Sequence, residues 1–288
     1  MFDMVKGLFI VVMMLGHTLT DYYPPWVIRN DGTWIGLAYD MLDRLLCCGM
    51  IPMFCIICGY GFRQKPMGKC LRGQIRFLWK PYVWMTLAIT AGIAAEKLLL
   101  HGSIGEGLRY QVLPYLLGTC PQGRYFGMEL GSVGPVWFLI VYVLAGVLLN
   151  ALLHEQHLWG QVLLAAVLAA AGVALKDIRI PFCFQQSLIC TLYMYIGWLM
   201  KKKKLLQTSI PLRWWVIGGA AVLFSVCFGE IEVSQNVWGG GLTDVLAGVF
   251  GGVMLLMVLL PLNERRGRAA SALRWAGRRI MPMPWARG

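Results

Sequence analysis

Charged residues are scarce in this sequence, and the acidic ones are the scarcest. Only 14% of its 288 residues are charged, 14 of them acidic against 26 basic, and 58% are hydrophobic. Soluble domains carry about 25% charged residues. The mean hydropathy is +0.63, and the apolar residues gather in blocks close to the roughly 20 residues that cross a bilayer. This composition excludes an ordinary soluble domain and predicts an all-α polytopic membrane protein.

Motifs of the common soluble enzyme classes are missing as well. The sequence has no glycine loop that would cradle phosphates, no Ser-His-Asp set and no metal-ligand cluster, so no bound metal is expected. Histidine is rare, with four residues in the chain. Three of them, His101, His154 and His157, lie near connections without metal-like spacing, and we interpret them as solvated.

Nine cysteines are present, yet the sequence predicts no disulfide framework. Most of them lie within apolar segments or near their ends. Cys70 and Cys120 fall in connections predicted on opposite sides of the membrane, so they cannot pair with each other. Cys55 and Cys58 have a redox-like spacing, but no second cysteine pair or histidine lies beside them. We interpret both as small apolar residues of a helix interior.

The chain is expected to form a bundle of about eight transmembrane helices. The segments are residues 5–22, 45–62, 81–100, 136–153, 158–175, 182–200, 213–229 and 242–262. Basic residues cluster in the second connection, in the sixth connection and after the last segment, and the positive-inside rule assigns these to the cytoplasm. The prediction is therefore a multi-pass protein of the cell membrane with a cytoplasmic N-terminus. The net charge of +12 follows from this topology, and no nucleic-acid partner is expected.

The longer connections fall on the opposite side, at residues 23–44 and 101–135. Loops longer than about 15 residues are often functional, so we expect substrate recognition outside the membrane. The chain after the last apolar segment is basic and contains Pro282 and Pro284. We expect a membrane domain over residues 1–265, followed at 266–288 by a basic cytoplasmic tail or by the start of a final helix of a longer natural chain.

One ionisable residue stands out inside the first apolar segment. His17 follows Lys6 by eleven residues, about 16 Å along a helix, and lies before the aromatic pair Tyr22-Tyr23 of the outer interface. An ionisable group at this depth usually faces the protein interior or a water-filled cavity. His17 is therefore either a hydrogen-bonding residue between helices or a chemical group.

Four motifs, in order along the chain and at the ends of expected helices, resemble acyltransferase family 3, a family of integral membrane O-acyltransferases. The resemblance as a whole covers roughly residues 1–265. The motifs are Asp3-x-x-Lys6-Gly7 with Leu15-Gly16-His17-Thr18, Ile51-Pro52-Met53-Phe54 with Cys58-Gly59-Tyr60, Arg76-Phe77-Leu78-Trp79-Lys80-Pro81-Tyr82, and Gly134-Pro135-Val136-Trp137-Phe138-Leu139. Gly197-Trp198-Leu199 is a weaker fifth match.

The chain departs from the family pattern at several positions. Ile51 stands where methionine is usual, and Cys58 stands where serine is usual. The arginine pair that precedes the proline of the third helix is spaced differently here. Trp275-x-Gly277-Arg278-Arg279 resembles the lead-in to a last helix that does not follow. The resemblance therefore implies a bundle that lacks the last span or two of the family, and this departure puts the activity of the chain in doubt.

The resemblance implies transfer of an acyl group, most often acetyl, from cytoplasmic acyl-CoA to a hydroxyl of an extracytoplasmic carbohydrate. Lys6 and His17 are then the catalytic candidates. The polyanionic donor, acetyl-CoA, would meet a basic cluster that otherwise only sets topology. The donor-binding candidates are Arg72, Arg76, Lys80 and Tyr60. Trp137 either packs at the interface or lines the acceptor site.

Two roles for His17 remain open. It acts as a general base on the acceptor hydroxyl, or it takes the acyl group and passes it on as a covalent relay. Two other classes of protein compete with the enzyme. A transporter or exporter would use His17 as a proton relay, although the sequence shows no paired internal repeat. A sensory membrane domain is the third possibility, but the chain carries no fused partner domain.

Overall fold

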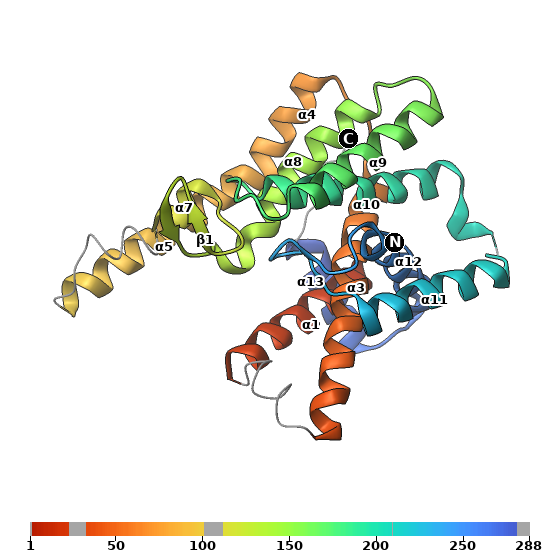
Figure 1. The fold of residues 1–288 in the computed structure, drawn as a ribbon, viewed down its shortest axis with the longest axis horizontal. Helices are drawn as coiled ribbons and strands as arrows, with labels where there is room; N and C mark the ends of the chain where they lie inside the picture. Colours follow the sequence, from red (N-terminus) through yellow and green to blue (C-terminus); the bar gives the residue numbers. More distant parts are fainter. Residues whose placement is uncertain (1, 23–32, 101–111, 209, 281–288) are drawn as a thin grey trace. The chain divides into compact units, whose positions relative to one another are not determined.

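The computed structural model describes residues 2–22, 33–100, 112–208 and 210–280, and they are mostly helical (Figure 1). The chain divides into two compact units. The first comprises Met1–Gly61, Ile196–Ile231 and Trp238–Ala286. The second comprises Phe62–Tyr195 and Glu232–Val237. A helix occurs at each of the eight apolar segments predicted from the sequence.

In the part of the chain that the structure describes, the first unit is built from five long helices and the end of a sixth. They are α1 (Asp3–Tyr22), α3 (Trp34–Gly61), α11 (Leu212–Phe228), α12 (Leu242–Leu259), α13 (Arg268–Ile280), and the last part of α10 (Phe184–Lys202). Two short 3₁₀ helices, η4 (Leu205–Gln207) and η5 (Leu260–Glu264), lie in its connections. Most of α10 belongs to the second unit.

The second unit contains the longest continuous helix among the described residues. Here α4 (Met67–Gln74), the π-helical turn η1 (Ile75–Trp79) and α5 (Lys80–Leu99) follow one another without a break. The other elements are α7 (Leu113–Leu117), β1 (Gly123–Tyr125), β2 (Met128–Leu130), η3 (Gly134–Val136), α8 (Trp137–Leu152) and α9 (Leu158–Ala174). The strands β1 and β2 form an antiparallel hairpin, and β3 (Ile231–Glu232) pairs with β4 (Val237–Trp238).

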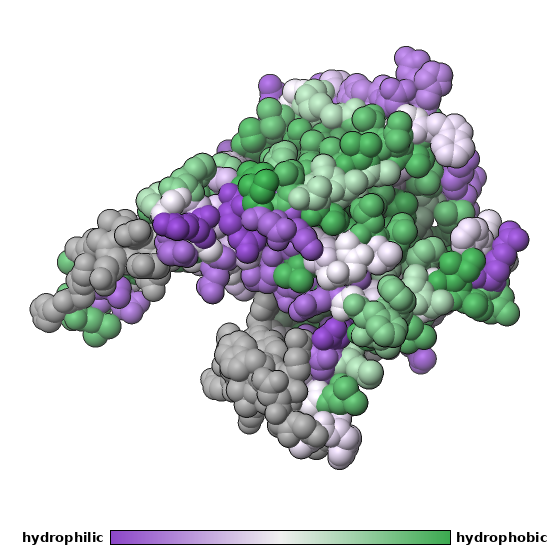
Figure 2. Space-filling view, viewed as in Figure 1, coloured by the Kyte–Doolittle hydropathy of each residue, from purple (hydrophilic) through white to green (hydrophobic). Residues whose placement is uncertain are grey.

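Four helices among the described residues are long and apolar enough to cross a membrane: Gly36–Gly61, Met67–Leu99, Gly134–Leu152 and Leu242–Glu264. Two shorter apolar helices occupy Leu158–Ala174 and Leu212–Phe228. Large apolar side chains cover the visible surface around α8 and α9 (Figure 2), where Trp159 is 84% exposed and Leu163 is 64% exposed. Soluble monomers rarely expose such continuous apolar surface. The helical membrane architecture is confirmed, and the number of eight spans stays a prediction.

Glycines permit close helix packing in the first unit. Gly251 and Gly252 of α12 lie against the backbone of α3, so that a Cβ added at Gly252 would come within 2.7 Å of the Met53 nitrogen. Small residues at such positions let two helix backbones approach closely. In the same way, a Cβ at Gly197 of α10 would overlap the carbonyl of Ile56 in α3.

The third predicted segment differs most from the structure. We expected a span at 81–100, preceded by a basic cytoplasmic connection, but the helix already begins at Met67 and packs against α8 from there. Asn150 of α8 exchanges hydrogen bonds of 3.0 and 2.9 Å with the backbone of Lys65, and the Cys70 thiol lies 3.9 Å from the Gly146 carbonyl oxygen. The start of this helix was predicted wrongly because the charged residues of the segment occupy only one helix face.

Candidate active site

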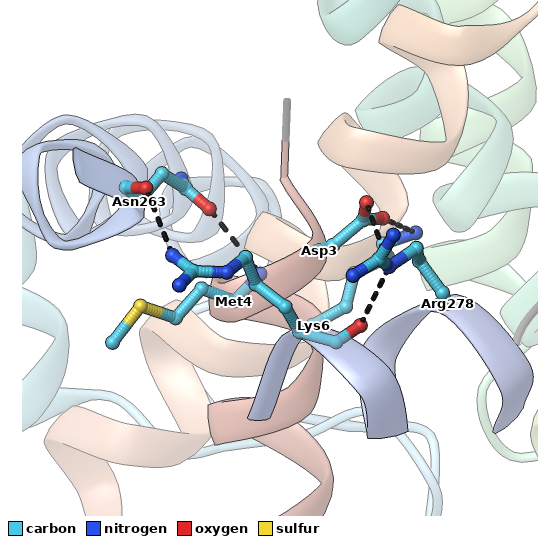
Figure 3. A network of polar contacts seen from close by, with 6 residues as sticks. Asp3, Met4, Lys6, Asn263 and Arg278 are labelled. Carbon is cyan, nitrogen blue, oxygen red and sulfur yellow. Dashed lines mark hydrogen bonds and ion pairs between the residues drawn. The ribbon is translucent and has the colours of Figure 1, made fainter. Parts of the chain in front are cut away.

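Lys6 is buried near the beginning of α1. The residue is only 6% exposed, and its ammonium group lies 2.8 Å from the Asp3 carboxylate one turn earlier. The second oxygen of Asp3 lies 3.9 Å from the Nε atom of Arg278 in α13 (Figure 3). A buried ammonium group is costly without a counter-charge, and Asp3 supplies that charge to Lys6.

Contacts from the C-terminal part of the first unit hold the start of α1 in position. The Met4 N–H donates to the Asn263 side chain at 3.2 Å, and Arg274 donates to the Asn263 carbonyl at 3.3 Å (Figure 3). The same guanidinium donates to the Arg265 carbonyl at 2.9 Å. A pocket of about 400 Å³ opens beside this network, lined by Asp3, Leu260, Asn263, Glu264 and Arg274.

Two glycines bring α13 against α1. A Cβ added at Gly7 would overlap the Leu273 carbonyl, and one added at Gly277 would overlap the Asp3 carbonyl. The sequence pattern at Gly277 and Arg278 predicted the lead-in to a further helix and gave no link to Lys6. The structure shows instead a helix, α13, that packs on the segment carrying the catalytic candidates. Whether a domain boundary falls at residue 265 stays a prediction.

His17 lies on α1, eleven residues beyond Lys6, which corresponds to about 16 Å along the helix. Its side chain lies outside the described residues. Tyr60, near the end of α3, belongs to the same unit. Its ring meets the ring of Phe2 edge to face at a centroid distance of 5.2 Å. The structure therefore brings Tyr60 to the end of α1 where Lys6 is buried.

The basic donor-site candidates form one stripe in the second unit. Arg72, Arg76 and Lys80 follow at four-residue intervals on the continuous helix, and all three are exposed. The face that packs within the unit is formed by Cys70, Gln74, Leu78, Tyr82 and Thr86. We call the three exposed cations the basic stripe.

The basic stripe runs beside α8, a helix long and apolar enough to cross a membrane. Cys70 lies at the level of Gly146, and Trp79 lies at the level of Ile140 and Leu144, with which it lines an apolar pocket of about 390 Å³. Arg72 and Arg76 fall between these levels. They therefore lie along the length of α8. The sequence had predicted them beyond the end of this helix, in a cytoplasmic connection.

Trp137, the candidate for the acceptor site, is the first residue of α8 and is 7% exposed. Its burial places it in the packing of the second unit, and its role toward a substrate stays a prediction. Lys6, His17 and Tyr60 thus belong to the first unit, whereas the basic stripe and Trp137 belong to the second. Among the described residues, no three His, Cys, Asp or Glu side chains gather as metal ligands.

Comparison with known proteins agrees with the four motifs. The family model described as the acyltransferase domain, that of acyltransferase family 3, matches residues 2–283, which is nearly the whole chain and includes α13. No curated protein and no solved structure matches the chain. The chain belongs to acyltransferase family 3 and is a membrane acyltransferase.

Proposed function

We propose that the protein transfers an acyl group, specifically acetyl, from cytoplasmic acyl-CoA to a hydroxyl of an extracytoplasmic cell-envelope carbohydrate. The observation that carries this proposal is the basic stripe. Three exposed cations on a helix beside a membrane-spanning helix are costly unless they face water or an anion. A polyanionic donor that approaches from the cytoplasm supplies such an anion.

The donor is recognised through its phosphates. Arg72 and Lys80 are eight residues apart, about 12 Å along the helix, so the stripe can contact phosphates at more than one place on acyl-CoA. Arginine binds phosphate through two parallel N–H groups, whereas lysine acts as a compact charge. Tyr60 is the further donor contact that we propose in the first unit.

His17 carries the chemistry in this proposal, in one of two ways. As a general base, it takes the proton of the acceptor hydroxyl while that oxygen attacks the thioester carbonyl and the C–S bond breaks. As a relay, its nitrogen attacks the thioester and releases the CoA thiolate, and the acceptor oxygen then takes the acyl group from the imidazole. Lys6 provides a paired positive charge on the same helix, toward the donor side.

The test compares membranes that contain the native chain, His17→Ala or the control His157→Ala. His157 is exposed in the connection before α9 and has no proposed role. With radiolabelled acetyl-CoA, we expect the native chain and the control to discharge the donor. His17→Ala should lose at least about 100-fold, the usual contribution of a general base.

Two outcomes would contradict the proposal. Undiminished discharge by His17→Ala would remove the histidine from the reaction. Movement of a solute across the membrane without consumption of acyl-CoA would instead support a transporter that uses His17 as a proton relay.

A further inference from the structure

Hydrogen bonds join three segments of the second unit around the beginning of α10. The Phe182 N–H donates to the Leu117 carbonyl at 2.9 Å. The buried side chain of Gln186 donates to two carbonyls, that of Cys120 at 2.7 Å and that of Ser234 at 3.1 Å. The connection after α7, the start of α10 and the segment between β3 and β4 therefore have a fixed relation to one another.

Two cysteine thiols meet inside this junction. Cys120 is 2% exposed and Cys183 is fully buried. The Cys183 thiol lies 3.3 Å from the Gly118 carbonyl oxygen, and the Cys120 thiol lies 3.0 Å from that of Ser234. The backbone contacts place the two residues side by side, because the Cys183 thiol reaches the carbonyl two residues before Cys120, and Gln186, three residues after Cys183, donates to the Cys120 carbonyl. Each cysteine also has the largest effect on the thiol pKa of the other, and both are free thiols.

The surroundings favour the reactive form of one of the two thiols. The neighbouring Cys183 lowers the pKa of the Cys120 thiol, although burial acts in the opposite direction, and Ser132 and Arg179 contribute to the lowering. In the folded junction, the Cys120 thiol is therefore the more acidic of the two.

We propose that Cys120 and Cys183 form a disulfide in the mature protein. This inference rests on the orientation in the proposed function, which puts the connection after α5 outside the cytoplasm, where disulfides persist. The oxidant is a protein disulfide of that compartment. As the connection folds, the thiolate of one of the two cysteines attacks it and forms a mixed disulfide, and the other cysteine then displaces the oxidant as a dithiol. Both protons leave the cysteines, and the oxidant gains their two electrons.

The bond would have a definite structural effect. It would join the connection after α7 covalently to the residue just before α10, at the place where hydrogen bonds already hold the two segments. Both sulfur atoms are buried, so exchange takes place while this connection folds. Once the unit has folded, reductants reach the bond poorly.

The experiment counts thiols in the full-length protein. Membranes are quenched with acid, denatured in detergent and treated with a maleimide polymer, with or without prior reduction. Without reduction, we expect two fewer of the nine cysteines to react. Cys120→Ser or Cys183→Ser should each make all the remaining cysteines reactive, whereas the control Cys70→Ser should still show two protected cysteines. Peptide mapping should find the peptides of Cys120 and Cys183 joined.

A separate variant tests the orientation. Phe126 is 72% exposed in the turn between β1 and β2, so Phe126→Cys should react with an impermeant maleimide on intact cells. If it reacts while all native cysteines stay free, the disulfide is refuted and the orientation stands. If it does not react from outside, the orientation fails and the disulfide proposal falls with it. A bond between any other pair of cysteines would also overturn the inference.

Discussion

At the scale of single residues, the pair Lys6 and Asp3 is the most informative feature. A lysine that is 6% exposed is rare, and the carboxylate beside it also lies near Arg278. Removing one partner of a buried ion pair leaves a charge without compensation, and this costs more than the pair contributes. The ion pair is therefore a sensitive point of the first unit.

We expect Asp3→Asn to lower the stability of the protein by about 3 kcal/mol, because it leaves the Lys6 ammonium buried without its carboxylate. Thermal unfolding in detergent measures the loss. Lys6→Met in the same background should restore most of it, since the uncompensated charge is then gone. The control Asp177→Asn, at an exposed position, should unfold like the native chain. Equal unfolding of Asp3→Asn and the native chain would show that the pair is unimportant for stability.

Some single residues of the candidate site could be identified from the sequence alone. Lys6 and His17 could be selected because an ionisable residue in an apolar segment is unusual by itself. The partners of Lys6 could not be found, because Arg278 lies at the other end of the chain and only folding brings it to Asp3. The contact between Cys120 and Cys183 was hidden for the same reason.

At the scale of elements, the packing of α13 on α1 depends on two glycines. A side chain at Gly7 would meet backbone atoms of α13, which cannot move aside as a flexible side chain would. Overpacking of this kind typically costs about 1–3 kcal/mol. The contact therefore specifies glycine, although nothing in the local sequence of α1 requires it.

Gly7→Ala should loosen α13 and make its arginines accessible to trypsin at lower protease concentrations. Limited proteolysis followed by mass spectrometry of the cleavage sites measures this. Gly16→Ala on the same helix is the control, because a Cβ at that position meets nothing within 4 Å. If both variants are cleaved like the native chain, α13 does not depend on close packing against Gly7.

The basic stripe gives a second prediction at this scale. Arg76→Gln should raise the KM for acyl-CoA by about ten-fold or more, because a hydrogen bond to a charged group contributes about 1.5–3 kcal/mol. Lys97→Gln, near the far end of the same helix, is the control and should leave the KM unchanged. Initial rates over a range of donor concentrations distinguish this effect from a loss of kcat. Equal KM values for both variants would remove the stripe from donor binding.

Most helices could be predicted, but the start of the third could not. Apolar length alone locates α8, α11 and α12 within a few residues. In the third segment, Arg72, Arg76 and Lys80 lowered the local hydropathy and concealed the buried face between them. That face becomes visible only beside its partner, since Gln74 packs where Gly146 of α8 has no side chain.

At the scale of the whole molecule, the exposed surface is the property that composition predicted best. Apolar residues such as Trp159 and Leu163 stand on the outside of α9, where a soluble protein would place polar ones. The division into two units was not foreseen, because a series of apolar segments contains no signal of which helices pack together. Hydrophobic patterning specifies that a helix is buried in lipid or protein but does not select its neighbours.

The π-helical turn η1 determines which side of the helix the residues after it face. In an ordinary α-helix, residues spaced four positions apart are rotated by about 40° from one to the next around the helix axis. The fifth residue of such a series would therefore lie almost opposite the first. A wider turn at Ile75–Trp79 offsets part of this drift and keeps Cys70 and Tyr82 on the same buried side. Loss of one residue there would act as a rotation of about 100° on everything that follows. A change of length at η1 would therefore change the side of the helix on which every later residue lies.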